Sequence, residues 1–289
     1  MAVPGLTCRP VRGRAELDLV LDWAAAEGWN PGLSDAEAFA AMDPEGFRVA
    51  ELAGEALPVA SISVVRYGPA FGFLGFYICR PGHRGKGIGW ALWQAGMAHL
   101  GPARCVGLDG VVAQQENYRK SGFVLQRRNL RFGAADPRAP AAPAGVQVTG
   151  AAALPFEALA AYDRTCFEAP REAFLRPWLG LPGHVALAAR TGDRLSGYGV
   201  IRAAREGSKI GPLFADGPAE AAALLAGLLA RRPAPGPVFL DVPETNAAAM
   251  ALARAAGMQP AFETARMYRG APPPVRAERI YGVTTFELG

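Results

Sequence analysis

The chain has 289 residues, of which 51% are hydrophobic and 19% are charged, and its formal net charge is +4. A length of this order is expected for about two domains, and the apolar content is sufficient for two hydrophobic cores. The four cysteines are widely separated without a Cys-x-x-Cys pair, and the three histidines lack metal-ligand spacing. Neither disulfides nor a metal site is therefore predicted.

Charge and hydropathy argue against two classes of partner. Nearly all of the positive charge is arginine scattered among acids, and the basic cluster at 127–131 is accompanied by no nucleic-acid-binding motif, so nucleic acid is not an expected partner. The longest clean apolar run, near Ala221 to Ala230, is too short to span a bilayer. The first residues have no basic segment followed by an apolar core, so we expect no signal peptide and a cytoplasmic protein.

The most informative segment is a glycine-rich loop between a strand and a helix. An apolar run over 71–79 predicts a buried strand, and residues 91–100 predict a helix. The loop between them has glycines at the alternate positions Gly85, Gly87 and Gly89. Such glycines let the backbone approach a ligand and turn several N–H groups toward it, next to the positive end of the helix dipole. The sequence therefore predicts an anion-binding loop, with a simple turn at the helix start as the alternative.

The residues of the loop distinguish between known kinds of phosphate-binding loop. A Walker A loop needs Ser or Thr after its lysine, where Gly87 follows Lys86, and a dinucleotide fingerprint needs a third glycine where the chain has Trp90. The pattern Arg84-x-x-Gly87-x-Gly89 instead resembles the pyrophosphate loop of the GNAT superfamily, the acyl-CoA-dependent N-acetyltransferases.

A second motif supports the same resemblance. An apolar stretch over 105–109 predicts a strand, and the polar helical segment after it ends in Tyr118-x-x-x-Gly122-Phe123. This ending resembles the closing motif of a GNAT domain, at about the distance from the loop that the family uses. One difference is Val111, which stands where many GNAT domains have an asparagine seven residues before this tyrosine. Taken alone, the glycine is a helix C-cap and the tyrosine a packing residue.

The resemblance covers most of residues 1–135 and implies an α/β (α+β) domain, with a mixed, mostly antiparallel twisted sheet flanked by helices. In such a domain the strands before and after the helix splay apart, and the pantetheine arm of acetyl-CoA lies in the gap. The backbone of Ile78, Cys79 and Arg80 would bind the pantetheine. The pyrophosphate would be bound by the amides of the loop residues Arg84, Gly85, Lys86, Gly87, Ile88, Gly89 and Trp90.

The resemblance also places Tyr118 beside the thioester sulfur. A phenol of pKa about 10 within hydrogen-bond reach can stabilise or protonate the departing thiolate, whose pKa is about 8.5. The general base is open, because residues 71–79 contain no carboxylate. Asp109 is the first candidate and Glu116 the second, with a solvated loop acid as the alternative for each. Cys79 is expected to be a small apolar residue rather than an acyl-enzyme nucleophile, since GNAT transfer is direct.

Residues 136–145 are rich in Ala, Pro and Gly and predict a linker. Beyond the linker, in residues 146–289, the pattern partly repeats. Residues 184–202 predict two strands around a Gly-Asp turn, as residues 49–66 do around a Gly-Glu turn, and 246–258 resembles the helix that ends in the Tyr-x-x-x-Gly-Phe motif. The second half therefore resembles a second GNAT fold, and the tandem resembles two-domain bacterial GNAT proteins of the YitH type.

The second half lacks the features that would bind a donor. After its predicted strand at 209–214 come Asp216 and Glu220, which would repel a pyrophosphate, and Ala253 stands where the first half has its motif tyrosine. Asn246, seven residues before that alanine, is either a retained family residue or a helix cap. We expect the second half to be a degenerate, GNAT-like partner that packs on the first domain.

The sequence leaves the acceptor open. GNAT domains place variable helices at the acceptor mouth, so the resemblance implies that Trp29, Asn30 and Asp35 contribute to it, although aromatic residues there are also typical of a core. The acceptor would be a small-molecule amine or a peptide N-terminus, and a homodimer is compatible with the sequence. We predict an N-acyltransferase that transfers acetyl from acetyl-CoA to a primary amine by direct attack. The alternative is a noncatalytic acyl-CoA or small-metabolite binding module, because no obvious base is present.

Overall fold

The computed structural model describes residues 3–102, 104–141 and 143–289. The first half contains β1 (Leu6–Pro10), α1 (Gly13–Ala26), α2 (Asp35–Met42), β2 (Phe47–Leu52), β3 (Ala60–Tyr67), β4 (Phe71–Cys79), α3 (Ile88–Leu100), β5 (Cys105–Val111), α4 (Gln115–Lys120) and β6 (Val124–Ala134). The second half contains β7 (Val146–Gly150), α5 (Phe156–Asp163), α6 (Glu172–Trp178), β8 (His184–Thr191), β9 (Arg194–Ala203), β10 (Ser208–Ala215), α7 (Pro218–Leu229), β11 (Val238–Pro243), α8 (Ala247–Ala255), β12 (Gln259–Arg269) and β13 (Ile280–Gly282).

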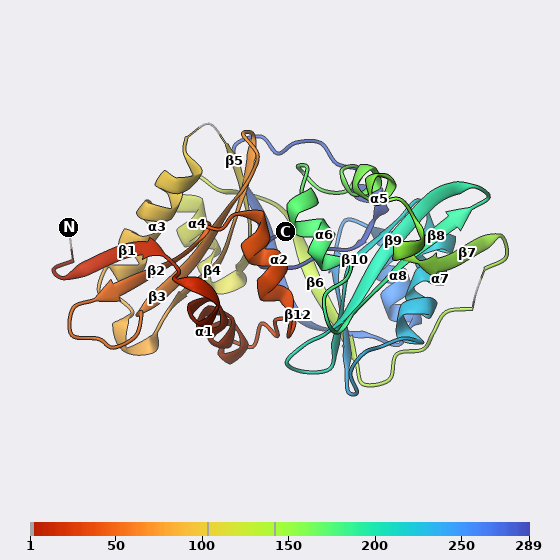
Figure 1. Cartoon of the computed structure of the whole chain (residues 1–289), viewed down its shortest axis with the longest axis horizontal. Helices are drawn as coiled ribbons and strands as arrows, with labels where there is room; N and C mark the ends of the chain where they lie inside the picture. The colour runs from red at the N-terminus through yellow and green to blue at the C-terminus, as the bar shows by residue number, and fades with distance from the viewer. Residues whose placement is uncertain (1–2, 103, 142) are drawn as a thin grey trace.

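The strands of the described residues form one sheet of thirteen that runs along the molecule (Figure 1). Its order is β1-β2-β3-β4-β5-β12-β6-β11-β10-β9-β8-β7, and β13 pairs with β10. The pairs β4–β5 and β10–β11 are parallel, and the other pairs are antiparallel. The predicted α/β class, with a mostly antiparallel sheet and flanking helices, is confirmed. The structure adds that the two predicted sheets are continuous.

The sheet is continuous because each half gives a long strand to the other. β6 pairs with β11 and β12 of the second half, and β12 pairs with β5 of the first. Arg131 of β6 lies opposite Asp241 of β11, and Arg266 of β12 lies opposite Asp109 of β5. The two crossings are therefore related by a pseudo-two-fold axis between β6 and β12, as in domain-swapped dimers.

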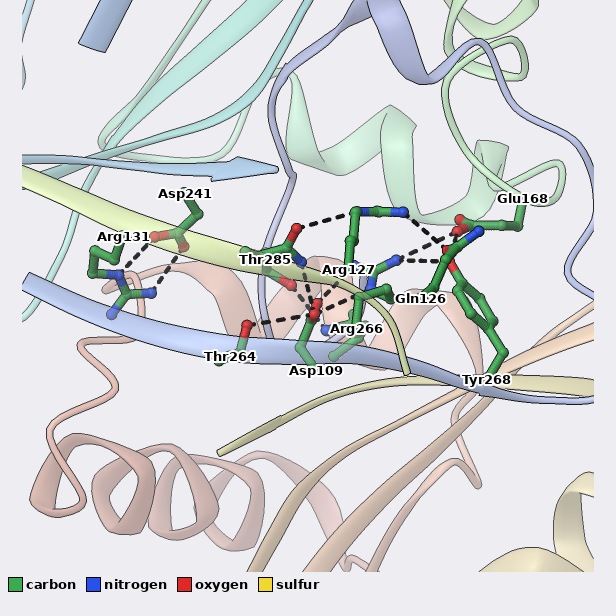
Figure 2. Close-up of polar contacts among 12 residues, drawn as sticks. Asp109, Gln126, Arg127, Arg131, Glu168, Asp241, Thr264, Arg266, Tyr268 and Thr285 are labelled. Carbon is green, nitrogen blue, oxygen red and sulfur yellow. Dashed lines mark hydrogen bonds and ion pairs between the residues drawn. The ribbon is translucent and has the colours of Figure 1, made fainter. Parts of the chain in front are cut away.

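Each crossing is held by a buried ion pair with two hydrogen bonds (Figure 2). Arg131 donates from Nε to Oδ1 of Asp241 at 2.7 Å and from Nη2 to Oδ2 at 2.8 Å. Arg266 donates from Nε to Oδ1 of Asp109 at 3.1 Å and from Nη2 to Oδ2 at 2.6 Å. None of the four side chains is more than 4% exposed. Loss of one partner from such a pair would leave the other charge buried and uncompensated.

Helices cover both faces of the sheet. Ile62 and Val64 of β3 pack with α3, whereas Val65 packs with α1 and α2, because alternate residues of a strand point to opposite faces. The core on the α1 side is shared by the halves, since Phe39 of α2 stacks on Trp178 of α6 with 6.2 Å between ring centroids. None of the helices in the described ranges is long and apolar enough to cross a membrane.

The last residues of the sequence return from the second half to the first. After β13, the Val283 amide donates to the carbonyl of Asp241 at 2.9 Å, and the hydroxyl of Tyr67 donates to the carbonyl of Leu288 at 2.9 Å. Residues 281–289 are all buried, and the C-terminus lies near the middle of the molecule (Figure 1). Residues 283–289 are called the C-terminal segment below.

Replacing Asp109 by asparagine should lower the free energy of unfolding by about 3–5 kcal/mol, because the Arg266 guanidinium would stay buried without its counter-charge. The matched variant Asp241→Asn removes the same partner from Arg131 at the other crossing, and its loss should be similar. Denaturant unfolding measures both losses. A loss below about 1 kcal/mol, the value of an exposed pair, in either variant would contradict the role assigned to that crossing.

Residues 1–135 expressed alone should aggregate, because the fragment exposes the edge of β5 that β12 covers and leaves β6 without β11. Residues 136–145 lie between β6 and β7, and their role as a linker between two domains stays a prediction. Sedimentation of the fragment, with and without residues 146–289 supplied as a second chain, measures its state. A soluble, monomeric fragment would show that the strand exchange is dispensable for the first half.

Candidate functional site

The two strands that flank the glycine loop separate partway along their length. β4 and β5 pair only as far as Leu74 and Leu108, yet β4 continues to Cys79 and β5 to Val111. At this point β4 has a bulge against β3, and Phe76 has a φ of 46°, a conformation that is costly for a bulky residue. The bulge leaves a gap between β4 and β5, bordered by backbone groups of both strands.

The glycine loop leaves its amides free for a ligand. Gly85 and Gly87 have φ values of 75° and 79°, in the left-handed region that favours glycine. α3 begins directly after Gly87. No backbone carbonyl of the described residues accepts a hydrogen bond from the amides of Gly85 through Trp90. These donors stand at the positive end of a 13-residue helix, so the loop is suited to an anion.

One cavity of about 610 Å³ extends from the loop along the gap between β4 and β5. Its size is within the range of small-molecule sites. Of the residues that the sequence predicted, the wall includes Trp29, Ile78, Cys79, Arg84, Gly85, Gly87, Gly89, Trp90, Asp109 and Tyr118. The predicted residues that do not line it are Asn30, Asp35, Arg80, Lys86, Ile88 and Glu116.

Tyr118 reaches the cavity from α4. Its ring stacks on Trp93 with 5.9 Å between centroids and lies against Gly110, where an added Cβ would overlap the tyrosine ring. Burial raises the pKa of Tyr118 well above its ordinary value. The phenol therefore stays protonated at neutral pH, so Tyr118 can donate a proton to a ligand in the cavity but is not a base.

Cys79 at the end of β4 and Arg84 in the glycine loop have defined surroundings. Burial raises the pKa of the Cys79 thiol, with Arg84 and Lys86 opposing the shift, so the cysteine stays a thiol and is a poor nucleophile. Arg84 donates from Nε to the carbonyl of Cys79 at 2.7 Å and from Nη2 to Glu27 at 2.5 Å, which ties the loop to β4 and α1.

Within 3–102, 104–141 and 143–289 no group of His, Cys, Asp and Glu has the arrangement of a metal site.

The structure gives Asp109 a role at the strand crossing. Both of its carboxylate oxygens accept from Arg266, and Oδ1 also accepts from the amide of Asn129 at 2.7 Å. An equivalent ion pair, Arg131–Asp241, occurs at the other crossing, where Asp241 belongs to the half that lacks the glycine loop. This recurrence favours a structural role for Asp109, and a role as general base stays a prediction that the geometry does not favour.

Two acceptor candidates lie away from the cavity. Asp35 is fully buried and accepts from Arg202 at 3.0 Å, and Asn30 exchanges hydrogen bonds of 2.9 Å and 2.8 Å with the backbone of Glu206. Both contacts join the N-terminal helices to the second half. The geometry therefore does not favour acceptor contacts for these two residues, whereas the neighbouring Trp29 does line the cavity.

Sequence reasoning missed the part of the wall that the second half supplies. Phe262 and Thr264 come from β12, and Phe286 and Glu287 come from the C-terminal segment. No local pattern marks them as neighbours of the glycine loop, because they reach it only through the strand exchange. Tyr77, which stands on β4 within the predicted strand, was also missed.

The corresponding gap of the second half is filled by the chain itself. β10 and β11 are parallel and separate after Ile210 and Leu240. β13 enters there: it pairs with β10 at Leu213, and the Val283 amide donates to Asp241 of β11. A strand of the protein thus occupies the place where the first half has its cavity.

Residues at the donor positions of the second half have structural contacts instead. Asp216 accepts from the hydroxyl of Tyr162 at 2.9 Å and lies 3.1 Å from Arg279. Asn246 caps α8, because its Oδ1 accepts from the amide of Ala249 at 3.1 Å, so the helix-cap alternative for this residue is confirmed. Directly before α7, the second half therefore has the carboxylate of Asp216, engaged by Tyr162 and Arg279, where the first half has its glycine loop.

Comparison with known proteins agrees with this geometry. A model described as the acetyltransferase (GNAT) family matches residues 15–123, and one described as an acetyltransferase (GNAT) domain matches residues 159–282. The chain is 35% identical over 274 residues to the holothin acyltransferase of Pseudoalteromonas sp. (strain SANK 73390), covering 95% of this chain and 92% of that protein.

Two solved structures show the same fold. A putative acetyltransferase from Pyrococcus horikoshii superposes with a TM-score of 0.82 at 22% identity, covering 100% of this chain and 98% of that one. A tandem GNAT protein from the clavulanic acid biosynthesis pathway superposes with a TM-score of 0.63 at 17% identity, covering 92% of this chain and 99% of that one. Fold and site therefore define an acyltransferase built from two joined domains of one type. The chain belongs to the GNAT family, as a tandem GNAT acyltransferase.

Replacing Gly87 by valine should abolish binding of an acyl-CoA, because a β-branched residue disfavours a φ of 79° and would move the loop amides. Wild-type protein should melt at a higher temperature with the ligand, a stabilisation of about 2.7 kcal/mol at 100 times Kd. The control is Gly192→Val, which imposes similar backbone strain in the β8–β9 turn, away from the cavity. Calorimetric titration that finds unchanged binding in Gly87→Val would contradict the assignment.

Proposed function

We propose that the protein transfers an acetyl group from acetyl-CoA to a primary amine by direct attack of the amine on the thioester. The observation that supports this most is the single cavity that joins the free amides of the glycine loop, the gap between β4 and β5 and the Tyr118 side chain. A donor with an anionic end and a long neutral arm fits this cavity, with the anionic end at the loop and the arm in the gap. The cytoplasm, where such donors are made, is the proposed location.

The residues present fit such a donor. The amides of Gly85 through Trp90 would bind the pyrophosphate at the start of α3. Past Leu74 and Leu108, β4 and β5 no longer bond to each other, so their backbone groups can pair with the amides of a pantetheine arm. The thioester would then lie deep in the gap, next to Tyr118 and Cys79.

Tyr118 would assist the departure of sulfur. The amine nitrogen forms a bond to the carbonyl carbon, and the carbon–sulfur bond breaks to release a thiolate of pKa about 8.5. A buried phenol that stays protonated can donate its hydrogen to that sulfur as charge develops. Cys79 lies in the same wall, but as a thiol of raised pKa it would take no covalent part.

A small-molecule amine is the proposed acceptor. The curated relative at 35% identity is a holothin acyltransferase, and the alignment spans both halves of this chain. The acceptor end of the cavity is lined by Trp29, Phe262 and Phe286, which offer an apolar surface to a small molecule.

Replacing Tyr118 by phenylalanine should lower kcat by about 100-fold or less and leave the affinity for acetyl-CoA nearly unchanged, because the proton donor is lost and the ring packing is kept. Gly110→Ala keeps the hydroxyl but pushes the ring off β5, so it should lower kcat as well. Steady-state rates with an amine panel, together with Kd for acetyl-CoA, measure both effects. An effect on affinity alone would make Tyr118 a packing residue, and wild-type binding without any turnover would contradict the proposed function.

A further inference from the structure

The cavity wall contains Glu287, whose buried carboxylate has no hydrogen-bond partner among the described residues. Of its three carboxylates, Glu27 and Asp109 are paired with arginines, whereas Glu287 has no hydrogen-bond partner for either oxygen among the described residues. Glu287 is only 2% exposed. Burying a carboxylate without a hydrogen bond to either oxygen is costly, so this position favours a ligand that supplies one.

The C-terminal segment holds Glu287 firmly against β4. Its backbone carbonyl lies on Gly75, at a place where an added Cβ would overlap it. On the next residue, the carbonyl of Leu288 accepts from Tyr67 at 2.9 Å, and its amide donates to Oγ1 of Thr285 at 2.9 Å. The glutamate therefore stands beside the β4 bulge, the same strand in which residues 71–79 offer no carboxylate of their own.

The charged groups around Glu287 come from three strands of the second crossing. The ammonium of Lys209 on β10 lies 4.0 Å from Oε1, and Arg131 on β6 is paired with Asp241 on β11. Burial lowers the pKa of Lys209 to about 8, with Arg131 adding to the shift and Glu287 opposing it. Lys209 is thus mostly charged at neutral pH and places a positive charge beside the carboxylate of Glu287.

Aromatic rings complete this end of the cavity. The Arg131 guanidinium lies 4.8 Å from the ring centre of Phe286 and 5.7 Å from that of Phe262, which fixes both rings in the wall. Trp29 lines the same cavity. A carboxylate surrounded by aromatic rings is suited to bind a ligand that carries a positive charge on a flat apolar body.

We propose that Glu287 binds the ammonium group of the acceptor and removes its proton, and that the acceptor is an amine with a flat apolar body held by Trp29, Phe262 and Phe286. This inference rests on the proposed function. It makes the second half a contributor to catalysis, through a segment that runs from the filled gap between β10 and β11 to the wall of the cavity beside β4.

The proton balance is as follows. Glu287 takes one proton from the ammonium, and the free amine lone pair forms the carbon–nitrogen bond at the thioester carbonyl. The carbon–sulfur bond breaks, the sulfur takes the phenolic proton of Tyr118, and the second proton of the nitrogen restores that phenol. The products are an amide and a free thiol, and the proton on Glu287 passes to solvent.

Replacing Glu287 by glutamine tests the proposal with little change in shape. We expect kcat to fall by at least about 100-fold, with the Kd for acetyl-CoA and the melting temperature close to those of the wild type. The control is Glu263→Gln, on β12 between two wall residues, whose half-exposed carboxylate lies 3.6 Å from Arg128 outside the cavity. This variant should keep wild-type rates.

Two further measurements separate a base from a packing residue. The wild-type profile of kcat/KM against pH should fall on the acid side, and Lys209→Met should move that fall to higher pH, because the carboxylate loses a neighbouring positive charge. Tryptamine and benzylamine should exceed ethanolamine in kcat/KM by at least about 10-fold, on the basis of their apolar bodies.

The outcomes distinguish the two levels of the argument. A wild-type protein that transfers no acetyl group to any amine would contradict the proposed function itself. A wild-type protein that transfers it, with Glu287→Gln retaining kcat and the acidic fall, would overturn the role of Glu287 alone. Equal rates with ethanolamine and tryptamine would overturn the substrate class.

Discussion

The exchange of β6 and β12 is the constraint on which the rest of the molecule depends. These two strands form the centre of the sheet. β6, from the first half, pairs with β11 of the second half, and β12, from the second half, pairs with β5 of the first. The ion pairs Arg131–Asp241 and Arg266–Asp109 fix the register at both crossings. Because β12 carries Phe262 and Thr264 into the first half, the exchange also builds part of the cavity wall. Stability and site therefore share one element.

Each half of the described chain has one parallel strand pair whose strands separate and leave a gap. Only the gap of the first half can hold a ligand. In the first half the bulge at Phe76 separates β4 from β5 and leaves a cavity. In the second half β13 closes the opening between β10 and β11 with its own backbone groups. β13 makes the hydrogen bonds that a ligand would otherwise make with these strands. The second half therefore lacks both the glycine loop and an open gap for a ligand.

Local chemistry could be predicted from the sequence, whereas long-range placement could not. The strand at 71–79, the helix after Gly87 and the tyrosine at the end of α4 follow from hydropathy period, glycine conformation and a family motif, all of which are local. The ion pair of Asp109 was not predicted, because its partner Arg266 is 157 residues away in sequence. Asp35 and Asn30 likewise contact residues of the second half, which no short-range pattern reveals. Because of the strand exchange, residues that are far apart in sequence lie close together in space, and this is so at the functional site.

The buried path of the C-terminal segment has a consequence for how such a chain can diversify. The glycine loop, proposed to bind the donor, is encoded entirely in the first half, whereas Phe262, Phe286 and Glu287, proposed to bind the acceptor, are encoded in the second. Substitutions that alter acceptor choice can therefore accumulate in the half that has no donor loop to preserve. A tandem arrangement of this kind would let selection on acceptor choice act on one half while selection on donor binding acts on the other.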